Sequence, residues 1–487
     1  MVNYEQFLDM IPEVALVAVL LIIFFADLFC SKGNPRRVAI LSTLSAVLLV
    51  CPLVVSALAA PAYAFEGLYV ATPMANVMKV ILTSGAIIVS IMARPWLETE
   101  GRHTVGEFFM LIASTLLGMY VMISSGHFLM FFLGLETASV PMACLVALDK
   151  KKRQSAEAAA KYILTATFSS GVMLYGISLL YAATGTLYFT DAATALAAIN
   201  PFSLQLLLPV AGMVFFFSGL GFKLSLVPFH FWTADTYQGA PTPVTGYLSV
   251  VSKGAAALAA FIILTKVFAP LAEQWTLMLG ILIMLTITVG NLFAMRQTEL
   301  KRFMAFSSIS QAGYIMLAVL GQGSQTGATA LTFYVLVYVV ANLAVFTVIS
   351  AVEQRSGRTD MEAYAGLYAT NPRLAFLMTV ALFSLAGIPP FAGMFSKFFV
   401  FMAAVDGHEA EPFWAYLVVF VALINTVVSL YYYLLIVKAM YIKKTVTPLP
   451  AFASAASTKL ALALCTLGIA VFGIASCVYQ WIAAAAV

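Results

Sequence analysis

The feature that most constrains this chain is a series of apolar segments, each about 20 residues long, that recurs from one end to the other. A helix of that length spans the roughly 30 Å hydrocarbon core of a bilayer and is longer than most buried helices of soluble domains. The alternating segments of about ten residues that mark membrane β-barrel strands are absent from the sequence. The pattern therefore predicts an all-α polytopic membrane protein whose helices satisfy their own backbone hydrogen bonds.

Composition excludes a soluble domain. Hydrophobic residues make up 62% of the chain and charged residues only 9%, whereas charged residues are about 25% of a typical soluble domain. We predict about 14 transmembrane helices, over residues 10–30, 38–59, 75–92, 107–124, 128–148, 162–183, 206–233, 246–268, 277–295, 303–321, 328–352, 374–404, 413–437 and 460–481.

The basic residues fall almost entirely on one side of this predicted topology, and Lys and Arg in short loops mark the inner side of a membrane. Only Lys79 and Lys266 lie near span ends on the other side. We therefore expect both termini on the outer side, and we interpret the net charge of +4 as a topology signal with no basic patch for nucleic acid. The inner-side residues are Lys32, Arg36, Arg37, Arg94, Arg102, Lys150, Lys151, Lys152, Arg153, Lys161, Arg296, Lys301, Arg302, Arg355, Arg358, Arg373, Lys438, Lys443, Lys444 and Lys459.

Two predicted spans are each interrupted by proline and carry a lysine nearby. Span 206–233 contains Lys223 and Pro228, and span 374–404 contains Gly387-Ile-Pro-Pro-Phe-Ala-Gly393 followed by Lys397. Because these spans are five apart, they run in opposite directions, which is the pattern of inverted-topology repeats. We therefore predict two inverted five-helix repeats, each with a Pro-broken helix. The predicted units are an N-terminal three-helix segment (1–105), the first repeat (106–270), the second repeat (271–445) and a C-terminal helix (446–487).

Ionisable residues inside the predicted spans are the candidate functional residues, since each costs about 2.5–3.5 kcal/mol on insertion scales. Glu136 lies near the centre of the fifth span, and we expect it to remain ionised by facing Lys223 across the bundle. The alternative is a structural ion pair that only fixes helix register. Glu13 and Asp27 lie near the two ends of the first span, where we expect them to be interfacial.

Lys253 and Lys397 have no acidic partner at the centre of any predicted span. Buried lysines of this kind exchange protons at modest cost and suit a proton relay; the alternative is that they snorkel to an interface. His230 follows Lys223 by seven residues, about two helical turns, and suits the same relay unless it only hydrogen-bonds the backbone beside the break. We interpret the many aromatic residues, including Tyr431 to Tyr433, as lipid-facing or packing surface.

The cysteines and histidines show no pattern of a redox or metal site. The five cysteines are scattered without CxxC spacing, and the four histidines are far apart in sequence. We therefore expect no cofactor and no metal in this chain.

The residues around both breaks resemble the antiporter-like membrane subunits of respiratory complex I (NADH:quinone oxidoreductase). The resemblance rests on Lys223-Leu-Ser-Leu-Val-Pro-Phe-His-Phe-Trp232, on Gly239-Ala-Pro-Thr-Pro-Val244 with Ser252-Lys253, and on the 387–393 motif with Lys397. It covers essentially the whole chain. The Asp-Thr-Tyr-Gln-Gly-Ala-Pro run from Asp235, the lysine at 397 and the end after the fourteenth span resemble the family members that lack a lateral helix. The presence of the first three spans points to a bacterium.

This resemblance implies a proton-translocating subunit of an NADH-quinone oxidoreductase in the bacterial cell inner membrane. It implies as partners the antiporter-like subunit M and small neighbouring membrane subunits, besides the lipid bilayer. Quinone, FMN and iron-sulfur clusters would belong to partner subunits, where quinone reduction would drive transport.

The resemblance also implies roles for the buried residues. Glu136 would modulate the charge of Lys223, Lys253 with His230 would connect two half-channels, and Lys397 would release or gate the proton toward the outside. The main alternative is a subunit of a multisubunit sodium/proton antiporter. Two others are a family member that has lost pumping and a scaffold in which the charges only specify packing.

Overall fold

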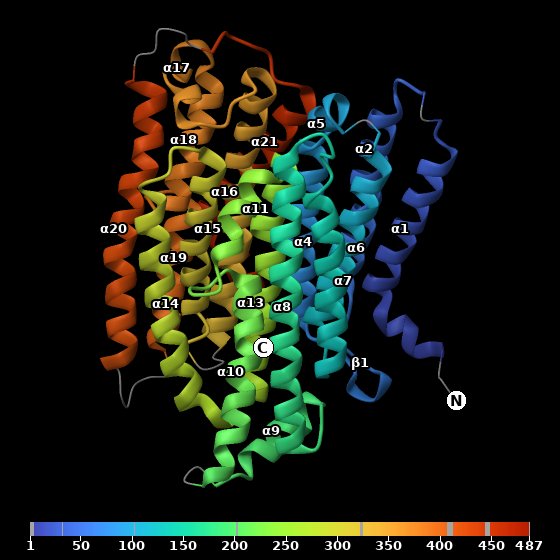
Figure 1. Cartoon of the computed structure of the whole chain (residues 1–487), viewed down its shortest axis with the longest axis vertical. Helices are drawn as coiled ribbons and strands as arrows, with labels where there is room; N and C mark the ends of the chain where they lie inside the picture. The colour runs from blue at the N-terminus through green and yellow to red at the C-terminus, as the bar shows by residue number, and fades with distance from the viewer. Residues whose placement is uncertain are drawn as a thin grey trace.

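The structure is a computed structural model that describes residues 4–31, 33–101, 103–200, 203–321, 325–406, 413–443 and 449–486. Helices stand side by side in one bundle, with α1 at one edge and α20 at the other (Figure 1). Lys32, Arg102 and Lys444 of the inner-side set lie outside the described residues, as does His408. The bundle confirms an all-α polytopic class.

The N-terminal part consists of three membrane helices and a short hairpin that the sequence did not predict. In the hairpin, Ala62 pairs with Ala71 and the two strands are antiparallel. The elements are η1 (Tyr4–Met10), α1 (Ile11–Phe29), α2 (Arg37–Leu48), α3 (Val50–Leu58), β1 (Ala62–Ala64), η2 (Phe65–Gly67), β2 (Tyr69–Ala71), α4 (Pro73–Met92) and α5 (Arg94–Thr99).

The next part contains the first broken helix, formed by α10 and α11, and two π-helical turns, η4 and η5. Its elements are α6 (Val105–Ile123), α7 (Phe128–Val146), α8 (Arg153–Thr184), α9 (Phe189–Ala197), η3 (Leu204–Leu206), α10 (Leu207–Leu224), α11 (Phe231–Gly239), α12 (Thr242–Tyr247), η4 (Leu248–Ser252), α13 (Lys253–Ile262) and η5 (Ile263–Val267).

The last part contains the second broken helix, formed by α18 and α19. Its elements are η6 (Ala269–Leu271), α14 (Ala272–Ala294), α15 (Leu300–Leu317), α16 (Gln325–Ser356), η7 (Met361–Tyr364), α17 (Leu367–Thr370), α18 (Pro372–Ala386), α19 (Ala392–Val405), α20 (Phe413–Tyr441), α21 (Ala456–Ile474) and α22 (Ser476–Ala485).

Within the described residues, 12 helices are long and apolar enough to cross a membrane. They match all the predicted spans except 303–321 and 374–404, so the count of 14 remains a prediction. The first exception is α15, whose polar residues lower its mean hydropathy. The helix can carry them because it lies inside the bundle and is almost entirely buried. The second is divided between α18 and α19, each shorter than a full span.

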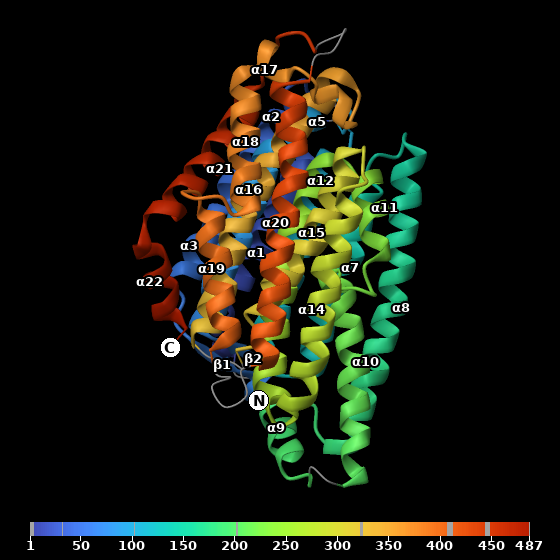
Figure 2. The ribbon, with the colours of Figure 1, turned by 90° about the vertical axis from the view of Figure 1, so that its left-hand side faces the viewer.

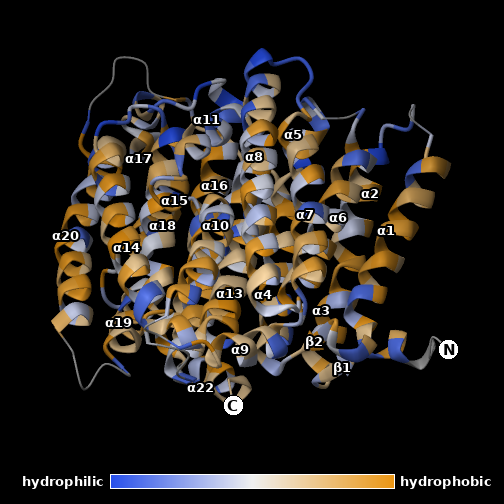
Figure 3. Cartoon of the chain, turned by 60° about the horizontal axis from the view of Figure 1, so that its bottom comes forward, coloured by the Kyte–Doolittle hydropathy of each residue, from blue (hydrophilic) through white to orange (hydrophobic). Residues whose placement is uncertain are grey.

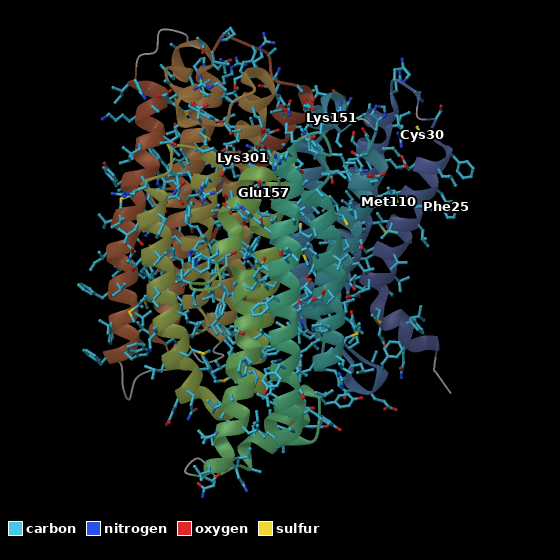
Figure 4. The ribbon with its side chains drawn as sticks, viewed as in Figure 1. Phe25, Cys30, Met110, Lys151, Glu157 and Lys301 are labelled. Carbon is cyan, nitrogen blue, oxygen red and sulfur yellow. The ribbon has the colours of Figure 1, made fainter. Side chains whose placement is uncertain are left out.

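Burial separates central helices from peripheral ones. In α16 94% of the most apolar window is buried within the protein, against 28% in the first span. Figure 3 shows hydrophobic residues along the helices and hydrophilic residues gathered near their ends. Phe25 of α1 is 51% exposed and points away from the bundle (Figure 4). The molecule therefore presents an apolar outer surface, as a lipid-embedded protein requires.

Both broken helices end on a residue in the left-handed region, three residues before a proline. Ser225 has φ 61° at the end of α10, and Gly387 has φ 87° at the end of α18. Figure 2 shows α10 below α11 but α18 above α19. The two broken helices therefore run in opposite directions, as predicted, while their grouping into five-helix repeats remains a prediction.

Glycines hold α7 unusually close to α6. A Cβ atom on Gly118 would lie 2.3 Å from the backbone nitrogen of Ala138, and one on Gly134 would lie 2.5 Å from that of Met122. Small residues allow this approach of two membrane helices, whose backbones would otherwise be kept apart. This contact fixes the position of α7, the helix that carries Glu136.

Candidate functional site

Lys223 occupies the last turn of α10 and is only 8% exposed. Its Nζ donates a hydrogen bond of 2.5 Å to Oγ of Ser139 on α7 and lies 5.5 Å from the centre of the Tyr162 ring. A cavity of about 10 Å³, also lined by Ser252, adjoins the amine. That volume is close to the space a single water needs. The cavity therefore brings Lys223 and Ser252, the residue before Lys253, to one small space.

Glu136 lies on α7 one turn before Ser139, so both side chains lie on the same side of that helix. The hydroxyl of Ser170 on α8 donates a hydrogen bond to the carboxylate. Among the described residues, no carboxylate lies within 4.0 Å of the Lys223 amine, although Glu136 acts on it electrostatically. The direct ion pair expected from the sequence is therefore not formed. Each charge is instead held by a serine.

Lys253 is 1% exposed and directly follows the π-helical turn η4. Its Nζ donates to both oxygens of Ser308 on α15, at 2.7 Å to Oγ and 3.1 Å to the carbonyl. The same Oγ is 3.2 Å from the hydroxyl of Tyr237, whose ring lies 5.8 Å from the amine. Snorkelling is thus excluded for Lys253, because its amine ends inside the bundle.

His230 lies between the break and α11 and is 8% exposed. Its ring packs against that of Phe231, 4.6 Å between centres, and its Nδ1 is buried with no hydrogen-bond partner among the described residues. Besides burial, the backbone of Pro228 at the break acts on this ring more strongly than Lys253 does, so the backbone contact considered as an alternative stays open.

Lys397 lies in α19 beside the second break and is 4% exposed. Its Nζ donates a hydrogen bond of 3.0 Å to the carbonyl of Ala386, at the end of α18, and lies 4.8 Å from the centre of the Tyr314 ring. The break frees that carbonyl from the helical ladder, so the lysine binds a group that the broken helix supplies. The side chain therefore turns toward the break and not toward an interface.

Two tyrosines and a glutamine join the second half of the site, and the sequence interpretation missed the tyrosines. Tyr334 and Tyr338 lie one turn apart on α16, 2% and 3% exposed. Tyr334 donates a hydrogen bond to Gln311 of α15, and all three line a cavity of about 10 Å³ beside Lys397. The signal was present as two tyrosines at i, i+4 spacing within the otherwise apolar stretch 333–341 of α16.

Tyr432 and Tyr433 fit the packing part of the aromatic interpretation, since both rings pack against Phe303, and they add polar contacts that the sequence did not predict. Both are fully buried, and each uses its hydroxyl: Tyr432 donates to Asn291 at 2.9 Å, and Tyr433 lies 2.6 Å from the Ser307 hydroxyl. Tyr431 is 57% exposed and does face outward. The two inner tyrosines belong to the polar interior around α15.

The interfacial position expected for Glu13 is wrong. Glu13 is 3% exposed and its carboxylate lies 2.7 Å from Nζ of the fully buried Lys79. The hydroxyl of Tyr69, on β2, donates to the same carboxylate at 2.9 Å. Asp27, at the other end of α1, is paired with Arg37. The sequence missed the Glu13–Lys79 pair because each residue lies only a few positions inside its helix.

Among the described residues, no group of three or more His, Cys, Asp or Glu side chains is placed to hold a metal ion. The buried site consists of lysine, glutamate, histidine and tyrosine side chains, which supply acid–base chemistry, with hydroxyls as donors and acceptors.

Comparison with known proteins agrees with this geometry. The family model described as "NADH:quinone oxidoreductase/Mrp antiporter, TM" matches residues 125–425, which include all five candidate site residues. A chain of respiratory complex I from Thermus thermophilus with bound aureothin is 31% identical, with a TM-score of 0.78, over 96% of this chain and 98% of that one. A chain of the Mrp complex from Dietzia is 20% identical with a TM-score of 0.80, over 99% and 97%, and shows the fold alone. The fold and the site thus define an antiporter-like membrane subunit.

One relative identifies the family of this chain within the class of antiporter-like membrane subunits. The NADH-quinone oxidoreductase subunit N of Phocaeicola vulgatus is 56% identical over 97% of each chain. This chain belongs to the subunit N family of NADH-quinone oxidoreductases.

Proposed function

We propose that this subunit of NADH-quinone oxidoreductase carries protons across the membrane through its row of buried charges. The observation that supports the proposal is that Lys223, Lys253 and Lys397 are each at most 8% exposed and hydrogen-bonded to a serine or to a backbone carbonyl. A lysine amine that is hydrogen-bonded to these neutral oxygens is not held in its charged form by a carboxylate, so it can take up and release a proton. An ionisable residue inside a membrane costs several kcal/mol, so such residues are as a rule retained for function.

The order of the contacts suggests a role for each residue. Glu136 sets the charge state of Lys223 electrostatically, while Ser139 binds the amine and Ser170 binds the carboxylate. From Lys223 the proton passes by way of the cavity at Ser252 to Lys253 with His230. Ser308 leads from Lys253 toward the Tyr334, Tyr338 and Gln311 cluster and then to Lys397, from which the proton leaves toward the outside.

Partners and location follow from the family. The chain lies with other membrane subunits of the complex, among which we propose the antiporter-like subunit M and smaller neighbours. Quinone, FMN and iron-sulfur clusters belong to partner subunits in this proposal, and quinone reduction there drives the protons here. The chain lies in the bacterial cell inner membrane, with both termini on the outer side.

The test is redox-driven proton pumping in membrane vesicles whose complex carries Lys223→Ala. We expect the complex to assemble while pumping and quinone reductase activity fall together by about 100-fold or more, the lower end of the effect of removing one acid–base group. Lys438→Ala is the matched control, since Lys438 is an exposed lysine at the end of α20. Assembly is measured in parallel by the amount of intact complex.

Two outcomes would replace the proposal. If pumping and reductase activity both survive Lys223→Ala, the buried charges only specify packing and the scaffold alternative holds. If transport in the vesicles requires sodium and proceeds without electron transfer, the chain acts as an exchanger subunit. An exchanger draws only on ion gradients, about 2.3 kcal/mol per charge per 100 mV.

A further inference from the structure

A groove opens on the outer surface of the bundle between the start of α18 and α21, away from the proton relay. Its volume is about 1020 Å³. The segment 451–454 closes its upper end beside Asn371, whose side-chain oxygen accepts from the Phe452 backbone at 3.1 Å. The groove is therefore a built feature, framed by two helices and an anchored segment.

The length of the groove matches one leaflet of a bilayer. Its lining on α21 extends from Lys459 to Ala470, which at 1.5 Å per residue is roughly 16 Å. Half of the roughly 30 Å hydrocarbon core is about the same depth. The walls below the rim are apolar and include Leu374, Leu377 and Leu467.

The rim of the groove is cationic. Arg373, at the start of α18, and Lys459, near the start of α21, both line it and are exposed. Within the described part of the chain, neither forms an ion pair. Both belong to the basic set that marks the inner side of the membrane, where anionic lipids attract cations.

We propose that this groove binds an anionic phospholipid of the inner leaflet, with its phosphate between Arg373 and Lys459 and one acyl chain along Leu374, Leu377 and Leu467. The charge at the rim selects an anionic head group, and the apolar wall of one-leaflet depth fits an acyl chain. A peptide strand would leave its backbone groups unpaired against such a wall, which is costly in a membrane.

The test uses the intact purified complex in vesicles that contain a photoactivatable phosphatidylglycerol or, in a second set, the matching phosphatidylcholine. Labelled positions are located by mass spectrometry. We expect the phosphatidylglycerol probe to label residues of α18 and α21 in the groove several-fold more than the phosphatidylcholine probe. Excess inorganic phosphate should not compete, because the acyl chain supplies part of the binding.

Variants separate the two parts of the site. Arg373→Gln and Lys459→Gln should each lower phosphatidylglycerol labelling roughly five-fold, as expected for one cation near an anionic surface. Leu467→Trp should lower labelling by both probes, since it fills the apolar wall. Arg296→Gln with Lys438→Gln is the control, because both are exposed basic residues on the same side that do not line the groove.

Three results would overturn the proposal. Equal labelling by the two probes would mean that ordinary lipid touches the surface without selection. Unchanged labelling in the Arg373 and Lys459 variants would show that these cations do not bind the head group. Absence of labelling by either probe in the intact complex would mean that a partner subunit covers the groove.

Discussion

Neutral oxygen atoms of hydroxyl and carbonyl groups, and not opposite charges, accept hydrogen bonds from the three lysines of the proposed relay. Lys223 donates to Ser139 and Lys253 to Ser308. A carboxylate in contact with either amine would hold it charged, whereas a hydroxyl accepts a hydrogen bond without adding a charge. The neutral partners thus leave both protonation states accessible, which is what a relay requires.

The Glu13–Lys79 pair is a contrasting case, because here the opposite charges touch. We predict that Lys79→Met destabilises the N-terminal segment by about 3–5 kcal/mol, since it leaves a buried carboxylate without its partner. The double variant Glu13→Gln with Lys79→Met should recover much of that loss. The measurement is the fraction of complex that keeps this subunit after graded heating.

Lys438→Met serves as the control for this experiment, as an exposed lysine whose loss should change retention little. A double variant no more stable than Lys79→Met alone would contradict the prediction. That result would show that the carboxylate is not the source of the destabilisation, and packing around the Lys79 stem would become the explanation.

At the scale of elements, the sequence predicted helices well wherever hydrophobicity decided them. The span expected at 128–148 is α7, Phe128–Val146, and the one expected at 107–124 is α6, Val105–Ile123. Both breaks were also predictable, because proline cannot continue the hydrogen-bond ladder. Hydropathy does not report which helix is central, so the sequence did not show that the span at 303–321, α15, is almost entirely buried.

The polar contacts between elements were beyond the sequence. Glu136 and Lys223 were both identified, yet the serines that hold them come from α7 and α8 at positions with no special signal. Tyr334, Tyr338 and Tyr433 looked like ordinary aromatic surface because burial depends on how α15, α16 and α20 pack together. Non-local contacts of this kind cannot be derived from local periodicity.

The second break should depend on Gly387 in two separable ways. Alanine there is strained at φ +87°, and its Cβ would lie 3.0 Å from Cδ of Lys397. We predict that Gly387→Ala lowers pumping per assembled complex several-fold, because it both costs about 1–2 kcal/mol of backbone strain and displaces the lysine. Proton pumping in vesicles, normalised to the amount of complex, measures the effect.

Gly185→Ala provides the matched control for this prediction. Gly185 also has a positive φ, +73°, but nothing lies within 4 Å of its Cβ position. Gly185→Ala should therefore introduce backbone strain without a new side-chain contact. We expect slightly reduced stability of the subunit and normal pumping per assembled complex. If the two variants lower pumping equally, contact with Lys397 plays no part and only the conformation of the break matters.

For the whole molecule, the central position of α16 bears on the proposed proton path, which joins distant parts of the chain. Its Tyr338 and Tyr334 face the polar interior between Lys253 on α13 and Lys397 on α19. Those lysines are far apart in sequence and belong to different predicted repeats. A path across the protein therefore requires both halves to pack on the same helix, which couples folding of the bundle to function.

η1 and the end of α22 lie toward one end of the bundle, away from Lys151 and Lys301 (Figures 1, 2 and 4). We predict that this end faces outward, since the basic loops mark the inner side. In a variant without native cysteines, an impermeant maleimide should label Leu204→Cys in intact spheroplasts but not Lys151→Cys; Leu204 is 85% exposed before α10. Inverted vesicles should give the opposite result, and both sites should react after detergent permeabilisation. Labelling of Lys151→Cys alone in spheroplasts would reverse the orientation and make the Lys397 end of the relay the entrance.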